Sequence, residues 1–182
     1  VDGVHIFLDG LMIAASQFGV PLIGALVVLQ WWSKVERVHV RHTCVASALS
    51  FLLGLGLNQI ILLFVHRVRP YDAGISHLII SRSLDWSFPS DHATASVAIA
   101  AALFLHGLQR HAMVCTIIAI LICWSRIFVG THYVTDVLGG GLVGIASAVM
   151  VWNFYRAGSR LDRFWASILG RSASPRSDLK PA

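Results

Sequence analysis

Five long stretches of this 182-residue chain contain no Asp, Glu, Lys or Arg, and this spacing of charge constrains the fold more than any other feature. All five are rich in Leu, Ile, Val, Ala and Phe. They cover residues 10–32, 43–65, 93–109, 111–125 and 137–155. A helix of about 20 residues, at about 1.5 Å per residue, crosses the ~30 Å hydrocarbon core of a bilayer. The pattern therefore predicts an all-α, multi-pass bundle of about five transmembrane helices.

The composition argues against three classes of protein. Hydrophobic residues make up 56% of the chain and charged residues only 13%, whereas about a quarter of an ordinary soluble domain is charged. Too few polar side chains remain to cover a soluble core or to keep the chain disordered in water. The net charge of +5 lies in islands between the apolar stretches. Nucleic-acid binding requires basic residues clustered on one solvated face, so we expect membrane lipids and no nucleic acid as partners.

The domain organisation is predicted to be simple. The chain has no repeat of fixed period and no second domain, and we expect one membrane domain over residues 1–170. The polar segment 171–182, which contains Ser and Pro, is typical of a disordered tail. At the N-terminus two interpretations remain open. Either the first stretch is one span, or residues 3–16 form a sixth, short interfacial helix and the span begins near Phe18.

Basic residues indicate which side of the membrane each loop faces. Lys34, Arg37 and Arg41 follow the first stretch, Arg110 follows the third, and further Lys and Arg follow residue 155. Five spans place these three regions on one side, which the positive-inside rule makes cytoplasmic, together with the C-terminus. Four arginines fall on the opposite face and need another explanation: Arg67, Arg69, Arg82 and Arg126.

Residues 88–92, Phe-Pro-Ser-Asp-His, are predicted at that opposite face. Pro and Ser before an apolar run are typical of a helix start, with Ser90 as the N-cap. A helix N-terminus presents free N–H groups and partial positive charge, which suits an anion, and His92 in the first turn is placed to reach the same anion. The alternative is an ordinary cap beside a surface histidine.

His132 and Asp136 form a second candidate pair at the same face. They are four residues apart, so on a helix they share one side. A carboxylate beside an imidazole fixes its tautomer and makes the other ring nitrogen more basic, as a nucleophile requires. The alternative is a loop histidine that forms a salt bridge.

Three of the outer arginines complete the group. Arg67, Arg69 and Arg126 each offer a planar set of donors that stays charged, and together they are suited to clamp a tetrahedral dianion. For each arginine alone, the alternative is contact with lipid headgroups at a span end. With two histidines, a serine and a carboxylate, the set is suited to phosphoryl transfer, in which a protein mainly positions groups and neutralises charge.

At these residues the chain resembles the type 2 phosphatidic acid phosphatase (PAP2) superfamily. The third motif of that family, Ser-Arg-x5-His-x3-Asp, is present in full from Ser125 to Asp136. The second, Pro-Ser-Gly-His, has Asp91 in place of Gly. The first, Lys-x6-Arg-Pro, keeps Arg69 but has Leu62 at the Lys position, and we expect Arg67 to replace the missing cation.

The Arg-x-Arg-Pro and Phe-Pro-Ser-Asp-His sequences resemble a bacterial subgroup, the undecaprenyl-diphosphate phosphatases of the bacitracin-resistance type. The resemblance implies an enzyme of the bacterial inner membrane with its active site on the periplasmic or extracellular face. The implied substrate is a lipid diphosphate such as undecaprenyl diphosphate. Phosphatidate, phosphatidylglycerophosphate and lipid A phosphate remain alternatives.

The resemblance also implies a mechanism without a metal or another cofactor. His132 attacks the terminal phosphorus and forms a phosphohistidine, Asp136 orients His132, and His92 protonates the leaving oxygen. The expected substrate-binding residues are Arg67, Arg69, Ser90, Asp91, Ser125 and Arg126.

Other classes of membrane protein fit the sequence less well. An anion or lipid transporter needs charges near the middle of the bilayer, whereas here they gather at one face. An intramembrane serine protease needs a buried Ser–His pair, whereas Ser90 and Ser125 lie at predicted span ends. A purely structural subunit leaves both histidines without a role. We expect Asn58 and Gln59, within the second stretch, to hydrogen-bond to a neighbouring helix.

Overall fold

The computed structural model describes residues 2–168, within which it contains six helices and no strand. They are α1 (Asp2–Gln30), α2 (Arg37–Leu62), α3 (Asp91–Leu105), α4 (Gln109–Phe128), α5 (Val134–Phe154) and α6 (Arg160–Ile168). By length and composition, α1, α2, α4 and α5 suffice to cross a membrane, while α3 is shorter. The predicted all-α, multi-pass bundle is confirmed, with a helix at each of the five apolar stretches.

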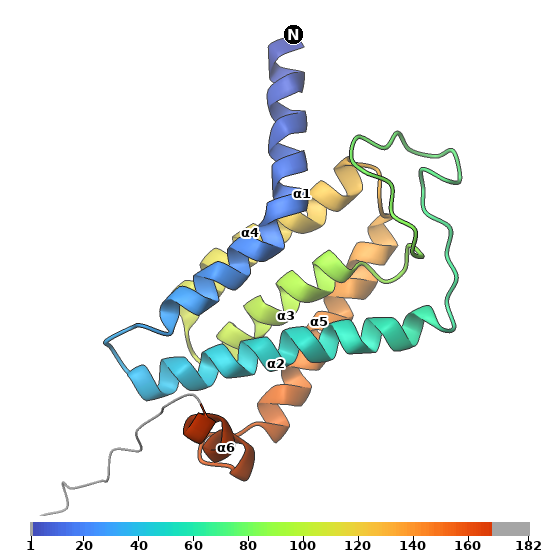
Figure 1. Cartoon of the computed structure of the whole chain (residues 1–182). Helices are drawn as coiled ribbons and strands as arrows, with labels where there is room; N and C mark the ends of the chain where they lie inside the picture. Colours follow the sequence, from blue (N-terminus) through green and yellow to red (C-terminus); the bar gives the residue numbers. More distant parts are fainter. Residues whose placement is uncertain (1, 169–182) are drawn as a thin grey trace, which may run out of the picture.

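Helix α3 lies at the centre of the bundle, between α2, α4 and α5 (Figure 1). Its 15 residues span only about 22 Å, less than a bilayer core. It is rich in Ala and largely buried by the neighbouring helices, so it does not have to match the thickness of the lipid. It ends at His106, where Gly107 turns the chain with a φ of 82°.

The N-terminal part of the chain forms one long helix, and a further short helix lies after α5. One continuous helix, α1, runs from Asp2 to Gln30, and its first half extends beyond the bundle in Figure 1. The short interfacial helix considered for residues 3–16 is therefore not a separate element. A sixth helix is present at the other end of the chain, as α6. The tail expected over residues 171–182 lies outside the part of the chain that the structure describes.

One end of the bundle is covered by the long connection between α2 and α3, residues 63–90 (Figure 1). This connection docks on the short turn between α4 and α5. The Ser76 hydroxyl donates to the carbonyl of Gly130 at 2.8 Å, and the N–H of Ile79 donates to the carbonyl of Val129 at 3.4 Å. Gly130 has a φ of 81°, and a Cβ there would overlap the backbone of His77. The tight turn and the close docking both require glycine at this position.

Helices α3 and α5 approach each other closely because α5 presents glycines to α3. A Cβ atom added at Gly144 would lie 2.7 Å from the carbonyl oxygen of Thr94 and 2.9 Å from the backbone nitrogen of Ala98. Small residues at such crossings allow tight packing between membrane helices. This packing brings the first turns of α3 and α5 together.

A buried polar contact joins α2, α3 and α5 just below those first turns. The amide nitrogen of Asn58, which is fully buried, donates to the Thr94 hydroxyl at 2.9 Å and to the Asp91 carboxylate at 2.6 Å. The Thr94 hydroxyl donates to the carbonyl of Gly140 at 3.0 Å. The prediction that Asn58 bonds to a neighbouring helix is confirmed, whereas Gln59 lies exposed on the helix surface.

Replacing Gly144 by Ala is expected to lower the thermal stability of the protein. The new methyl group meets backbone atoms that cannot rotate away, and such overpacking costs about 1–3 kcal/mol. The measurement is the Tm of the purified protein in detergent, followed by circular dichroism. Gly141→Ala is the matched control, because a Cβ there has its nearest neighbour at 3.9 Å. Equal Tm values for the two variants would contradict this account of the α3–α5 contact.

Asn58→Leu is expected to destabilise the protein more than Gln59→Leu. The first change leaves the buried Thr94 hydroxyl and Asp91 carboxylate without their amide partner, which costs about 1–3 kcal/mol. The second change replaces an exposed side chain on the next residue of the same helix. Thermal unfolding in detergent compares the two. A Tm for Asn58→Leu at or above that of Gln59→Leu would show that the polar contact does not stabilise the bundle.

Candidate active site

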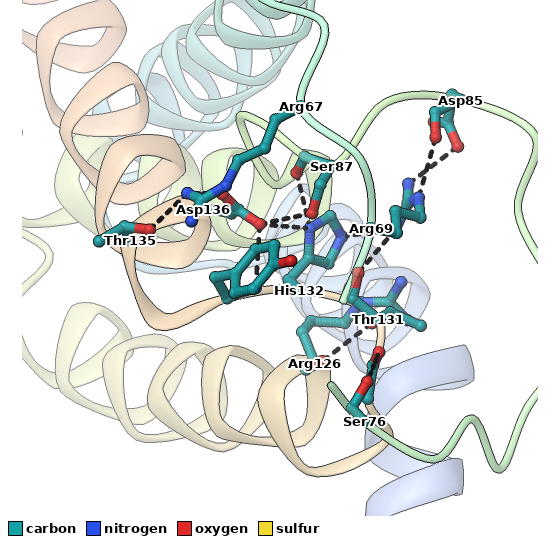
Figure 2. Close-up of polar contacts among 12 residues, drawn as sticks. Arg67, Arg69, Ser76, Asp85, Ser87, Arg126, Thr131, His132, Thr135 and Asp136 are labelled. Carbon is teal, nitrogen blue, oxygen red and sulfur yellow. Dashed lines mark hydrogen bonds and ion pairs between the residues drawn. The ribbon is translucent and has the colours of Figure 1, made fainter. Parts of the chain in front are cut away.

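The residues predicted at the outer face come together where the loop of residues 63–90 docks on the turn between α4 and α5. Figure 2 shows His132 between Asp136 on one side and Arg69 on the other, with Arg126 nearby. The loop contributes Arg67, Arg69 and Ser87, while the turn between α4 and α5 contributes His132. The site lies at the end of the bundle where α4 ends and α3 and α5 begin.

The hydrogen bonds of His132 define which of its ring nitrogens is free. Nδ1 lies 2.8 Å from the carbonyl oxygen of Ser87, which only accepts hydrogen bonds, so Nδ1 carries the proton. Nε2 therefore holds the lone pair, and it lies 3.3 Å from Nη1 of Arg69. Burial lowers the pKa of His132 below the ordinary 6.5; the Asp136 carboxylate opposes this shift, and the charge of Arg69 adds to it. The ring is thus a neutral base at pH 7, with Nε2 facing a guanidinium group.

Asp136, in the first turn of α5, has a completely buried side chain that is fully engaged. Its Oδ2 accepts from the backbone N–H of Tyr133 at 2.9 Å and from the hydroxyl of Ser87, and its Oδ1 accepts from Arg67 at 2.7 Å. Oδ2 lies 3.8 Å from Nδ1 of His132, within ion-pair range but beyond a hydrogen bond. The carboxylate therefore acts on the imidazole by its charge, and Ser87 makes the direct contact.

Arg67 contacts protein groups on the outer side of Asp136. Its Nη1 also donates to the Thr135 hydroxyl at 2.6 Å, and its guanidinium lies 4.0 Å from the ring centre of Tyr133. The side chain is 38% exposed. Arg67 is predicted from the sequence to bind substrate, and in the structure its guanidinium has a carboxylate partner.

Arg69 is held rigidly in the centre of the site. Its Nε donates to the backbone carbonyl of Asp85 at 2.9 Å, its Nη2 to the Asp85 carboxylate at 2.8 Å, and its Nη1 to the carbonyl of Thr131 at 3.1 Å. Burial alone would raise the pKa of Asp85, but the Ser83 hydroxyl and the charge of Arg69 hold that pKa below its ordinary range. The ionised Asp85 thus fixes the orientation of Arg69.

Two buried polar atoms of the site have no hydrogen-bond partner among residues 2–168, the part of the chain that the structure describes: Nε of Arg126 and the hydroxyl of Ser90. Arg126 comes from the last turn of α4, and its Nη1 donates to Ser16 of α1. Ser90 is the N-cap of α3, and its own N–H donates to the carbonyl of Asp136 at 3.1 Å. Buried polar groups are nearly always hydrogen-bonded. Two free donors beside a helix N-terminus are suited to the oxygens of a bound anion.

His92, in the first turn of α3, belongs to the same cluster. It lies within electrostatic range of Arg126, His132 and Arg69. Ser125 and Asp91, two other residues predicted to bind substrate, hydrogen-bond to other parts of the protein. The Ser125 hydroxyl donates to the carbonyl of Ile122 at 2.7 Å, and the Asp91 carboxylate accepts from Asn58.

Sequence reasoning missed three residues that fix the site. Ser87 and Asp85 lie in a loop without a periodic pattern, and Ser16 lies in the middle of an apolar stretch. The signal available for Ser16 was the pair of polar residues, Ser16 and Gln17, within an apolar stretch of α1. Among the described residues, no three His, Cys, Asp or Glu side chains are grouped so that they could hold a metal ion.

Comparison with known proteins identifies the family of this chain. Residues 42–160 match the PAP2 superfamily. The chain is 31% identical to undecaprenyl-diphosphatase BcrC of Bacillus subtilis, over 81% of this chain and 75% of that protein. It is 33% identical to the putative undecaprenyl-diphosphatase YbjG of Escherichia coli, over 74% of this chain and 67% of that protein.

The fold is also similar to a solved structure, that of a transmembrane PAP2-type phosphatidylglycerolphosphate phosphatase from Bacillus subtilis. The TM-score is 0.63 at 25% sequence identity, over 85% of this chain and 79% of that one. The family match covers more than half of the chain and includes every helix from α3 to α5. This multi-pass membrane protein therefore belongs to the PAP2 superfamily.

Proposed function

We propose that this protein is an integral-membrane lipid phosphatase that removes the terminal phosphate of a polyprenyl diphosphate such as undecaprenyl diphosphate. One observation carries the proposal. The unprotonated Nε2 of the buried His132 accepts a hydrogen bond from Arg69, in the same cluster that holds the unpartnered donors of Arg126 and Ser90. A nucleophile and a cationic cradle are the two parts that phosphoryl transfer needs.

The first step transfers the terminal phosphoryl group to the protein. Arg69, Arg126 and Ser90 bind its oxygens and stabilise the charge that spreads over them in the transition state. Nε2 of His132 forms a bond to phosphorus while the bond from phosphorus to the bridging oxygen breaks. Burial and the charges of Arg126, His132 and Arg69 disfavour a proton on His92, and the bound anion offsets these charges. In the complex His92 is therefore protonated and gives its proton to that oxygen, which leaves as part of the lipid monophosphate. The phosphorylated imidazole is cationic, and the Asp136 carboxylate stabilises it.

The second step restores the enzyme. His92, now unprotonated, removes a proton from a water molecule that attacks phosphorus, and the bond between phosphorus and Nε2 breaks. Inorganic phosphate leaves, and His132 returns to its neutral state with Nδ1 still bonded to Ser87. No metal or other cofactor takes part in this proposed sequence.

The choice of substrate rests on the relatives and on the position of the site. Two similar proteins are named as undecaprenyl-diphosphatases, which favours a polyprenyl diphosphate. The solved neighbour is named for phosphatidylglycerolphosphate, so that lipid, phosphatidate and lipid A phosphate are the alternatives to test. The site lies at one end of apolar helices, where a phosphate in water and a tail in the bilayer are both accommodated. An anion transporter is disfavoured because the arginines of the site gather at this end.

The orientation in the membrane is also part of the proposal. Lys34, Arg37, Arg41 and Arg110 lie at the end of the bundle opposite the site. The positive-inside rule then gives a cytoplasmic C-terminus and an active site on the periplasmic or extracellular face of a bacterial cell membrane.

Purified protein with EDTA present is expected to release phosphate from undecaprenyl diphosphate with a higher kcat/KM than from phosphatidate, phosphatidylglycerophosphate or lipid A. His132→Ala should lower this activity by about a thousandfold or more, because the nucleophile is lost. Phosphate release and protein-bound radiolabelled phosphate are the two measurements. His111→Ala, an exposed histidine at the other end of the bundle, is the matched control.

Wild-type turnover in His132→Ala would rule out the phosphohistidine mechanism. Loss of activity in EDTA that Mg²⁺ restores would rule out metal independence. A kcat/KM that is higher for phosphatidylglycerophosphate than for undecaprenyl diphosphate would identify the former as the preferred substrate. The proposed mechanism would not be affected.

The pH profile of kcat/KM is expected to fall on the acid side with an apparent pKa below 6.5. Attack requires unprotonated His132, and burial lowers the pKa of this residue, so the neutral form persists to lower pH than for a free histidine. Rates from about pH 5 to pH 8 test this. Phosphorus NMR of the substrate in the same detergent gives the titration of its phosphate group, so that this titration can be distinguished from that of His132. An acid limb that is centred above 6.5 and does not follow the substrate would contradict a buried neutral nucleophile.

A further inference from the structure

We propose that Arg67 and Ser87 are positioning residues for His132, Arg67 through Asp136 and Ser87 by direct contact, and that Arg67 does not bind the transferred phosphate. This inference rests on the proposed function, since it assigns roles in the same reaction. It explains how this chain departs from the first motif of the family. Leu62 stands where the motif has Lys, and an additional arginine, Arg67, lies two residues before Arg69.

The buried charge of Asp136 requires a partner, and Arg67 provides it. The Asp136 side chain is completely buried, and a carboxylate without water is costly unless a cation and hydrogen-bond donors satisfy it. Arg67 supplies the cation at 2.7 Å from Oδ1, whereas Oδ2 takes the Tyr133 N–H and the Ser87 hydroxyl. Arg67 thus offsets part of the buried charge of Asp136, alongside the Ser87 and Tyr133 donors, and fixes the carboxylate where it acts on His132.

Arg67 lies apart from the residues proposed to bind phosphate. Figure 2 shows Arg67 and Thr135 on one side of His132, beyond Asp136, and Arg69 and Arg126 on the other. The Nη1 atom of Arg67 donates to Thr135 and Asp136, and the guanidinium stacks on a tyrosine ring. The arginines of the cradle are almost completely buried, while Arg67 is 38% exposed.

Ser87 contacts each of the other three residues, Arg67, Asp136 and His132. Its carbonyl accepts from Nδ1 of His132 at 2.8 Å, its hydroxyl donates to Asp136, and its N–H donates to the carbonyl of Arg67 at 2.8 Å. Ser87 therefore selects the tautomer with Nε2 free and holds the plane of the ring. The ring and the carboxylate are oriented by one residue of the loop.

The balance of charge around His132 gives the direction of the test. Asp136 of α5 attracts a proton to the ring, while Arg69 of the loop and Arg126 of α4 repel it, and His92 of α3 lies nearby. Arg67 offsets part of the negative charge of Asp136. Without Arg67, the carboxylate attracts a proton on His132 more strongly, and the ring should titrate at higher pH.

The experiment compares Arg67→Gln with wild type in four measurements: kcat, KM, the inhibition constant of inorganic phosphate, and the titration of His132 by NMR of labelled histidine. The His132 signal is assigned by its absence in His132→Gln. We expect kcat to fall about tenfold or more, while KM and the inhibition constant change less than about threefold. The His132 titration should move to higher pH.

Four further variants make the test specific. Arg82→Gln removes an exposed arginine from the same loop and should leave all four quantities unchanged. Arg69→Gln should weaken inhibition by phosphate about tenfold or more, as expected for a direct ligand. Arg67→Lys should recover part of kcat, because it keeps the charge. Thr135→Val should lower kcat slightly without loss of folding, since Thr135 is exposed and only holds Arg67.

The outcomes separate this inference from the proposed function. If Arg67→Gln raises KM and the phosphate inhibition constant about tenfold with kcat intact, Arg67 is a phosphate ligand and the inference is wrong. An unchanged His132 titration also overturns it. The NMR readout needs no turnover, so an inactive wild type would defeat the proposed function while the titration still decides the role of Arg67.

Discussion

The Asp136 carboxylate is completely buried, and its requirement for partners determines how the outer loop must dock. A charged group at this depth is tolerated only where donors surround it, and the donors come from two separate parts of the chain. Tyr133 is local to α5, whereas Arg67 and Ser87 belong to the loop of residues 63–90. The loop can therefore satisfy Asp136 only in a position that also places Ser87 on His132. The same contacts fix the loop and orient the imidazole.

Much of the fold follows from charge spacing alone. The five charge-free stretches predict five helices because polar side chains are too costly in lipid and a helix satisfies its own backbone. Helix α3 differs from this account in length. At 15 residues it is too short to cross a bilayer in isolation, and it is covered by protein. Hydropathy reports that a segment is apolar and does not distinguish whether lipid or neighbouring helices surround it.

The site was predictable to the extent that its residues are close in sequence. His132 and Asp136 are four residues apart, and Ser90 begins a helix that His92 continues, so local geometry indicates each pair. The contact between Ser87 and His132 joins positions 45 residues apart, and that between Arg126 and Ser16 joins positions 110 apart. Such contacts depend on how helices and loop pack, and no short-range pattern in the sequence encodes them.

The exchange of Gly for Asp91 in the second motif is explained by a residue on another helix. A carboxylate beside the phosphate cradle would repel an anionic substrate if it pointed into the site. The Asp91 carboxylate instead accepts from Asn58 of α2 at 2.6 Å, and the same amide binds Thr94. The acidic side chain thus becomes part of the contact between α2 and α3. Asn58 and Asp91 form a hydrogen-bonded pair, so in the reaction that we propose the departure from the motif places no negative charge against the substrate.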